Sequence, residues 1–145
     1  MLNQYKARLV EKKPLTQDVY LFNFRLENNQ LLDFSPGQYI LIFIPNHQTN
    51  LLRLYSVASS AYTKNSFELI VKIIPNGKAS FYLNNLMPGQ KITFSGPAGV
   101  FTYRSFGKRR VYFLATGTGI APILSMIRTL FNKRENFQTH FFLYW

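Results

Sequence analysis

Residues 53–59 read Arg-Leu-Tyr-Ser-Val-Ala-Ser and place a cation, an aromatic ring and a hydroxyl in one short segment. In a β-strand, alternate side chains face the same side, so Arg53 and Tyr55 would lie together, with Ser56 at the strand end. A guanidinium pairs with phosphate oxygens and a ring stacks on a ring, so the segment suits a ligand with phosphate and a flat aromatic system. The alternative is an ordinary barrel strand with a surface arginine and a core tyrosine.

The composition indicates a folded, strand-rich protein. Of 145 residues, 47% are hydrophobic and 17% aromatic, which suits one domain, or one domain and part of a second. The chain has no cysteine, which excludes disulfides, a thiolate nucleophile and an iron-sulfur cluster held by this chain. Its two histidines, His47 and His140, lie far apart without a carboxylate cluster, so we expect no metal site.

The formal net charge is +11, from 17 basic and 6 acidic residues. This balance favours anionic partners such as a phosphorylated cofactor, an acidic electron-transfer protein, nucleic acid or a lipid surface. A solvated basic face is the alternative for any single lysine. The sequence contains neither a membrane-spanning apolar run nor a signal-peptide pattern, which predicts a soluble, cytoplasmic protein. The basic residues are densest at Arg104, Lys108, Arg109 and Arg110, and again at Arg128, Lys133 and Arg134.

The first hundred residues predict short strands separated by turns. The clearest alternation spans 19–26, whereas 38–44 is apolar on both faces and predicts a buried strand. Polar residues 11–14 are expected to end the first strand. Six short strands without long helices between them indicate an antiparallel barrel or sandwich. The predicted strands are 5–10, 19–26, 38–44, 53–58, 67–74 and 91–95.

A short helix is predicted within this region, beginning at Gly77-Lys78-Ala79-Ser80 and ending before Pro88-Gly89. Backbone N–H groups at a helix start bind anionic oxygen, and Lys78 adds positive charge. The alternative is that Ser80 serves only as the N-cap of a helix that covers the barrel.

The pattern changes after residue 101. Residues 111–115 are continuously apolar, as in a parallel strand covered on both faces, and 120–131 have helical spacing. Residues 140–144 form a second apolar strand. We therefore predict a strand-helix-strand unit that begins a nucleotide-binding α/β domain, with the domain boundary near 105–107.

The loop between the first of these strands and the helix reads Gly117-Thr118-Gly119. It differs from the usual G-x-G-x-x-G dinucleotide fingerprint because Pro122 stands where the third glycine would be. No Gly-Lys-Ser/Thr follows, which excludes a Walker-type phosphate loop.

Taken together, four motifs in this order resemble the ferredoxin-NADP reductase superfamily over almost the whole chain. The resemblance implies a six-stranded antiparallel Greek-key barrel that binds a flavin (residues 1–104), followed by part of a parallel α/β nucleotide-binding domain (residues 108–145). The motifs are Arg53-x-Tyr55-Ser56, Gly77-Lys78-Ala79-Ser80-x-Tyr82-Leu83, Gly96-Pro97-x-Gly99-x-Phe101 and Gly117-Thr118-Gly119-Ile120-Ala121-Pro122.

The same resemblance implies roles for individual residues. Arg53 would pair with the flavin phosphate, Tyr55 would pack on the flavin, and Ser56 would hydrogen-bond near the flavin N5, which accepts hydride. Thr118 would lie near the nicotinamide, so Ser56 and Thr118 are the expected catalytic residues. The segment 77–80 would hold a pyrophosphate, favouring FAD over FMN. The expected cofactor-binding residues are Arg53, Leu54, Tyr55, Ser56, Ile70, Val71, Lys72, Gly77, Lys78, Ala79, Ser80, Gly117, Thr118, Gly119 and Pro122.

The function that the resemblance implies is that of a flavin-dependent NAD(P)H oxidoreductase, or its N-terminal portion. Hydride would pass from NAD(P)H to FAD, and electrons would leave to a separate acceptor: a redox protein, a free flavin or a small molecule. Family members continue beyond a strand like 141–145, so one alternative is a truncated flavin-binding module without NAD(P)H turnover. A basic β-barrel that binds nucleic acid is a further alternative. It would show strong salt dependence and no flavin, and we expect no nucleic-acid partner.

Overall fold

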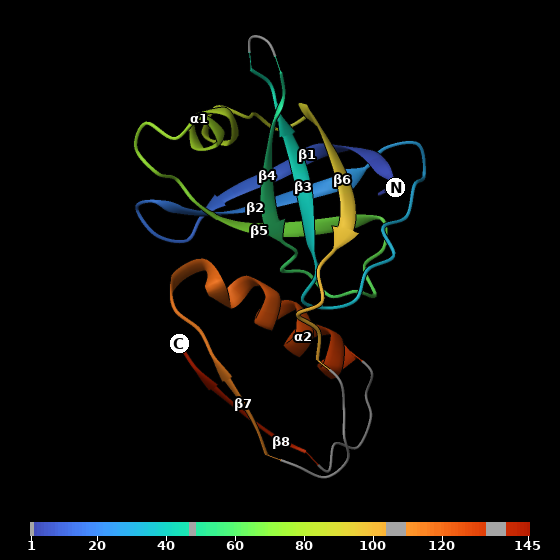
Figure 1. The fold of residues 1–145 in the computed structure, drawn as a ribbon, viewed down its shortest axis with the longest axis vertical. Helices are drawn as coiled ribbons and strands as arrows, with labels where there is room; N and C mark the ends of the chain where they lie inside the picture. The colour runs from blue at the N-terminus through green and yellow to red at the C-terminus, as the bar shows by residue number, and fades with distance from the viewer. Residues whose placement is uncertain (1, 47–48, 104–109, 133–138) are drawn as a thin grey trace.

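The computed structural model describes residues 2–46, 49–103, 110–132 and 139–145 (Figure 1). The predicted domain boundary near 105–107 lies outside these ranges, so the domain limits stay a prediction. Several basic residues and one histidine of the sequence analysis also lie outside the described residues, namely Arg104, Lys108, Arg109, Lys133, Arg134 and His47.

Six strands form one antiparallel sheet in the order β4-β3-β6-β1-β2-β5. A bridge between Val57 and Leu69 joins the two ends of this order and closes the sheet into a barrel. This arrangement confirms the predicted Greek-key barrel. The strands are β1 (Gln4–Pro14), β2 (Val19–Leu26), β3 (Tyr39–Ile44), β4 (Leu51–Ser56), β5 (Ser66–Lys72) and β6 (Lys91–Ala98).

Aromatic side chains fill the barrel. Phe24 stacks on Phe67 at a centroid distance of 5.4 Å, and Phe67 meets Phe94 edge-on at 5.0 Å. All three rings are fully buried. Because inward-facing residues alternate with outward-facing ones along each strand, the alternation of 19–26 becomes the inner face of β2.

Two predictions about the strands are wrong. The first strand continues through 11–14, where β1 pairs with β2 beyond a bulge, and the Lys12 ammonium lies 4.7 Å from the centroid of the Tyr20 ring. A polar segment can extend an exposed strand when its aliphatic stems cover aromatic rings. In β3, only Ile40, Ile42 and Ile44 are buried, since the other face lies on the outside of the barrel.

The short helix α1 (Lys78–Asn84) follows β5 in the chain (Figure 1). It packs against the barrel core through Leu83, with Leu86 just beyond it. Both leucines are buried. The apolar side of α1 therefore covers the core.

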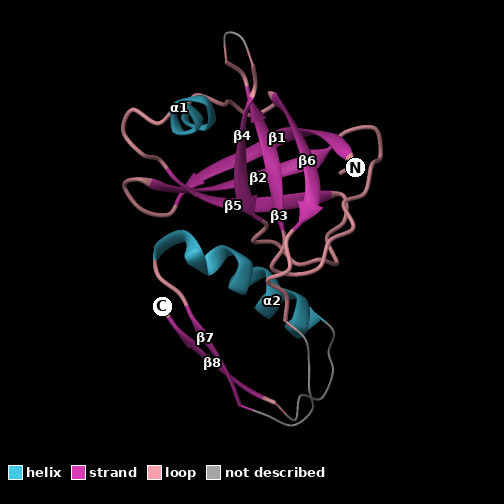
Figure 2. Ribbon diagram, in the orientation of Figure 1, coloured by secondary structure: helices cyan, strands magenta, loops and turns pink. Residues whose placement is uncertain are grey.

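The remaining elements form the predicted strand-helix-strand unit. The strands β7 (Arg110–Leu114) and β8 (His140–Tyr144) are parallel, and α2 (Ile120–Asn132) connects them after a 3₁₀ turn, η1 (Gly117–Gly119). Figure 2 shows α2 between the barrel and this two-stranded sheet. The expectation that 111–115 is covered on both faces is wrong: Phe113 is buried beside α2, whereas Leu114 on the opposite face is 73% exposed.

Candidate functional site

A cavity of about 540 Å³ lies where β4, β5, the start of α1 and the start of α2 meet. We call it the ring cavity. It brings together all of the predicted site residues except Gly117, and it adds Ile74 and Ala121. Its walls consist of Arg53, Leu54, Tyr55, Ser56, Ile70, Val71, Lys72, Ile74, Gly77, Lys78, Ala79, Ser80, Thr118, Gly119, Ala121 and Pro122.

The strand β4 places its side chains through its pairing with β3. Arg53 lies opposite Ile42 and Tyr55 opposite Ile40 in the register. Tyr55 is half-buried and packs against the barrel core, whereas Arg53 is exposed and its Nη1 donates to the Leu52 carbonyl at 2.8 Å. A rigid ring and an adjacent cation therefore share one wall of the cavity.

The electrostatics of the cavity favour an anion. Lys72 on the rim pairs with Asp18 at 3.2 Å, and its hydrogen bond is the main cause that lowers the pKa of that carboxyl. Within the described part of the chain, neither Arg53 nor Lys78 has a carboxylate partner. Two uncompensated cations beside a cavity attract phosphate groups.

Burial raises the pKa of the Tyr55 phenol, and the nearby Arg53 charge only partly opposes this effect. The phenol therefore stays protonated at neutral pH. It can donate a hydrogen bond to a ligand as well as offer its ring.

Gly77 is the N-cap residue of α1, and its backbone is extended. There is little free space around this residue. An added Cβ there would lie 3.2 Å from both the Ile74 carbonyl oxygen and the Ser80 hydroxyl oxygen. That hydroxyl accepts a hydrogen bond from the Ile74 N–H at 2.9 Å, so the alternative of Ser80 as the N-cap residue is wrong. Ser80 instead connects the end of β5 to the first turn of α1.

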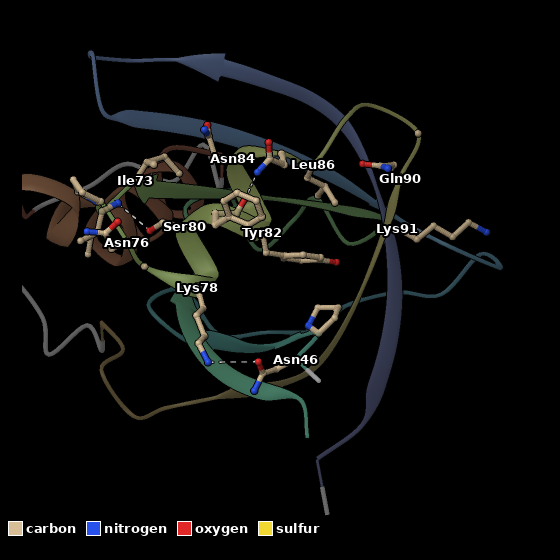
Figure 3. A pocket seen from close by; sticks show the side chains of 17 residues that line it. Asn46, Ile73, Asn76, Lys78, Ser80, Tyr82, Asn84, Leu86, Gln90 and Lys91 are labelled. Atoms are coloured by element: carbon tan, nitrogen blue, oxygen red, sulfur yellow. Dashed lines mark hydrogen bonds between the residues drawn. The ribbon is translucent and has the colours of Figure 1, made fainter. Parts of the chain in front are cut away.

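A second cavity of about 1080 Å³ adjoins the first around α1 (Figure 3). We call it the tail cavity. The two cavities share Ile74, Gly77, Lys78 and Ser80. In Figure 3, Lys78 and Asn46 face each other at one side, with Nζ and Oδ1 3.5 Å apart. An elongated ligand could therefore extend from one cavity into the other past Lys78.

Only two of the three residues in the Gly117–Gly119 loop before α2 line the ring cavity. Gly117 has φ +51°, and its carbonyl accepts the indole N–H of Trp145 at 3.0 Å. The Gly119 N–H donates to the Thr116 carbonyl at 3.0 Å. Thr118 and Gly119 line the cavity, but the structure does not bring Gly117 there. An added Cβ at either glycine would meet nothing within 4 Å, so the space beside this loop is open.

The described residues contain neither a metal-binding cluster nor a membrane-spanning helix. They contain no group of three or more metal-binding side chains. Among them there is also no helix with the length and apolar character needed to cross a membrane.

Comparison with known proteins identifies the family. The oxidoreductase FAD-binding domain model matches residues 6–103, and the oxidoreductase NAD-binding domain model matches 113–145. The chain belongs to the ferredoxin-NADP reductase superfamily. The two domain descriptions confirm the predicted FAD-binding and NAD-binding character of this superfamily member.

Individual relatives agree with this assignment. The chain is 33% identical to the glycine betaine monooxygenase reductase subunit of Pseudomonas aeruginosa, over 92% of this chain and 37% of that protein. It is 34% identical to ferredoxin-NADP reductase B of Sorangium cellulosum, over 86% of this chain and 51% of that protein. The structure of ferredoxin-NADP+ reductase from Plasmodium falciparum with 2'P-AMP superposes with a TM-score of 0.81 at 25% identity, covering 98% of this chain and 62% of that one. The chain thus spans about half or less of the length of these two curated relatives.

The ring cavity of this superfamily member fits the flavin that the family implies. Leu54, Ile70 and Pro122 give apolar walls for a flat ring, and Arg53 and Lys78 supply the cations that its phosphates need. At Gly77 there is little space for a side chain, so the backbone itself lines the cavity there. The donor set is therefore that of a phosphate-bearing aromatic cofactor.

Two wall residues were not predicted. Ile74 lies two residues after the end of β5. Its place in the cavity wall depends on how the chain turns after that strand, which the sequence pattern does not indicate. Ala121 lies inside the Gly-Thr-Gly-Ile-Ala-Pro motif, between Gly119 and Pro122, so the motif itself was the signal.

Proposed function

We propose that this chain is the FAD-binding and nicotinamide-facing part of an NAD(P)H oxidoreductase that passes electrons to a separate acceptor. The observation that carries the proposal is the convergence on one cavity of four separate segments, three of which belong to the motifs of the sequence analysis. The Arg53 strand, the C-terminal end of β5, the Gly77 turn and the Thr118 loop line the same space although they are separate in sequence.

In the proposed complex, Arg53 pairs with a flavin phosphate and gives up or shares its bond to the Leu52 carbonyl. Lys78 and the backbone of 77–80 hold the second phosphate of FAD. Beyond Lys78, the adenosine part of FAD extends into the tail cavity, where Tyr82 offers a partly buried ring. FAD should therefore bind more tightly than FMN.

FAD, when bound, supplies the chemistry of accepting hydride from NAD(P)H and releasing electrons one or two at a time. The chain supplies orientation. Tyr55 would pack on the flavin ring, the Ser56 hydroxyl would hydrogen-bond near the hydride-accepting position, and Thr118 and Pro122 would help to hold the nicotinamide. Positioning of this kind accounts for several kcal/mol of barrier lowering.

The acceptor is proposed to be a separate redox partner. This is supported by several relatives that are named as a subunit or component of a monooxygenase. The choice between NADH and NADPH is left to experiment, and the cytoplasm remains our proposed compartment.

The decisive experiment is flavin binding. The purified chain is expected to be yellow, or to become so with added FAD, and to bind FAD more tightly than FMN. A chain that stays colourless and fails to bind FAD would refute the proposal.

The role of Arg53 is tested by Arg53→Ala, with Arg25→Ala as control because Arg25 is also exposed but lies on β2, away from the cavity. Loss of a charged hydrogen bond should weaken FAD binding by about 1.5–3 kcal/mol, or about 10- to 150-fold. The control should not change it. If the two variants bind FAD with equal affinity, Arg53 does not contact the FAD phosphate.

A second candidate function is flavin binding without NAD(P)H turnover. Anaerobic titration with NADH and with NADPH separates the two functions. Bleaching of the flavin absorbance supports the oxidoreductase, and a persistent oxidised spectrum supports the flavin-binding module.

A further inference from the structure

Helix α2 is tied to the barrel by polar contacts that the proposed chemistry does not use. Ser125 is fully buried, and its hydroxyl donates to the Ser59 carbonyl at 2.7 Å. Arg128 Nη1 donates to the Ala58 carbonyl at 3.1 Å and forms an ion pair with Glu68 Oε2 at 2.5 Å. We call these five residues the α2 clamp.

The next turn of the helix adds two contacts. The backbone N–H of Ala61 donates to Thr129 Oγ1 at 3.0 Å, and Asn132 Nδ2 donates to Ser60 Oγ at 3.0 Å. The polar face of α2 thus meets the segment after β4 along two successive turns.

The barrel side of the clamp is continuous with two walls of the ring cavity. Ala58 comes two residues after Ser56, and Glu68 comes two residues before Ile70. These two segments also bind each other, because the Ala58 N–H donates to the Glu68 carbonyl at 2.8 Å. The clamp therefore attaches α2 to a part of the barrel that cannot move independently of β4 and β5.

The helix side of the clamp is close to the nucleotide loop. Pro122 lines the ring cavity, and Ser125 and Arg128 follow it by three and six residues on the same helix. At a rise of 1.5 Å per residue, they lie about 4.5 and 9 Å along the axis from Pro122. A shift of α2 at the clamp would therefore move Pro122 and the adjoining Thr118 loop relative to the cavity.

The Arg128–Glu68 ion pair is expected to contribute little to the stability of the fold. The side chains of Arg128 and Glu68 are 39% and 25% exposed, so solvent screens part of their attraction. Fixing one arrangement of two packed units is a better-supported use of half-buried polar contacts.

We propose that Ser125 and Arg128 are positioning residues, which hold the Thr118 end of α2 at the reacting edge of the flavin without touching either cofactor. The inference rests on the proposed function. Hydride transfer depends steeply on placement, since an error of about 1 Å can slow a reaction by about 100-fold. The clamp should therefore affect the rate of flavin reduction far more than the affinity for FAD.

The test uses the complete chain with FAD and compares Arg128→Met, Ser125→Ala and the control Arg25→Met. Trp145 is the single tryptophan and is hydrogen-bonded to the Thr118 loop, so energy transfer from it to bound flavin reports the position of that loop. We expect Arg128→Met to broaden the Trp145 lifetime distribution and to slow flavin reduction at saturating NADH or NADPH by at least about tenfold. FAD affinity should stay unchanged, and the control should match the wild type in all three measurements.

Unchanged lifetimes and reduction rates in Arg128→Met would overturn the inference. If circular dichroism shows that this variant is unfolded, Ser125→Ala decides, because it removes one hydroxyl and no charge. A wild-type chain that binds no FAD contradicts the proposed function instead. If FAD binds but neither nucleotide reduces it, the Trp145 lifetimes still decide whether the clamp positions the loop.

Discussion

Gly37 and Gly89 form a matched pair that tests how closely the barrel and α2 are packed. Both have positive φ, +100° and +91°, so alanine is strained at either position. The strain should cost about 1–3 kcal/mol in each case. What differs between the two sites is the space for an added methyl group.

At Gly37 that methyl group has no space. Its Cβ would lie 2.0 Å from the Phe101 carbonyl oxygen and 2.5 Å from Met126 Cε on α2, whereas at Gly89 nothing lies within 4 Å. The methionine can move, but the backbone oxygen moves only if the segment around Phe101 shifts. Overpacking of this kind adds about 1–3 kcal/mol, so Gly37→Ala should cost about 2–6 kcal/mol in total.

The assay is urea unfolding followed by far-ultraviolet circular dichroism, with linear extrapolation to water. Gly37→Ala is expected to lower the free energy of unfolding by about 1–3 kcal/mol more than Gly89→Ala. Equal losses in the two variants would refute the reasoning, because backbone strain would then account for the whole effect at Gly37.

Three further changes test other parts of the structure. Phe67→Ala should lower the free energy of unfolding by about 3–5 kcal/mol in the same urea assay, because its ring packs against two other buried phenylalanines, and a loss below about 1 kcal/mol would contradict this packing. Ser80→Ala should cost about 1 kcal/mol by leaving the Ile74 N–H without its hydroxyl acceptor, with Ser80→Thr as the variant that keeps a hydroxyl. The hydrogen bond from Lys91 is the main cause that lowers the pKa of Glu27, so this carboxylate stabilises the fold above its unfolded pKa and loses that contribution as pH falls through the folded value. Glu27→Gln should accordingly show a shallower loss of stability in acid, and identical pH profiles would rule out this contribution.

The strands could be predicted where the sequence alternates strongly. Residues 19–26 and 140–144 became β2 and β8 with the expected limits, because local hydrophobic pattern is enough to define an element. The extension of β1 through 11–14 was missed because it depends on the pairing of β1 with β2, where Lys12 covers the ring of Tyr20. Such a contact joins residues that no local pattern relates.

The candidate site was predictable through its motifs, but its geometry was not. The resemblance implied which segments would bind a flavin, and the fold brings all of these residues except Gly117 to one cavity. It could not indicate that the Gly117 carbonyl turns to Trp145, or that Ser80 bonds to Ile74, because each contact depends on the path of the backbone. Arg128 appeared only as one basic residue in a cluster, and its pairing with Glu68, which lies 60 residues away, follows from the packing of α2 on the barrel.

The contacts at Gly37 and at the α2 clamp restrain one helix from two directions. Met126 faces the turn that contains Gly37, while its neighbour Ser125 is bound to the segment after β4. A methyl group at Gly37 requires the Phe101 carbonyl to move, and its clash with Met126 is relieved either by the methionine side chain or by movement of α2. Energy transfer from Trp145 to bound flavin tests for movement of α2, because Trp145 is hydrogen-bonded to the loop at the start of that helix. A destabilised Gly37→Ala variant with wild-type energy transfer would therefore mean that the clamp holds α2 and the Phe101 segment yields.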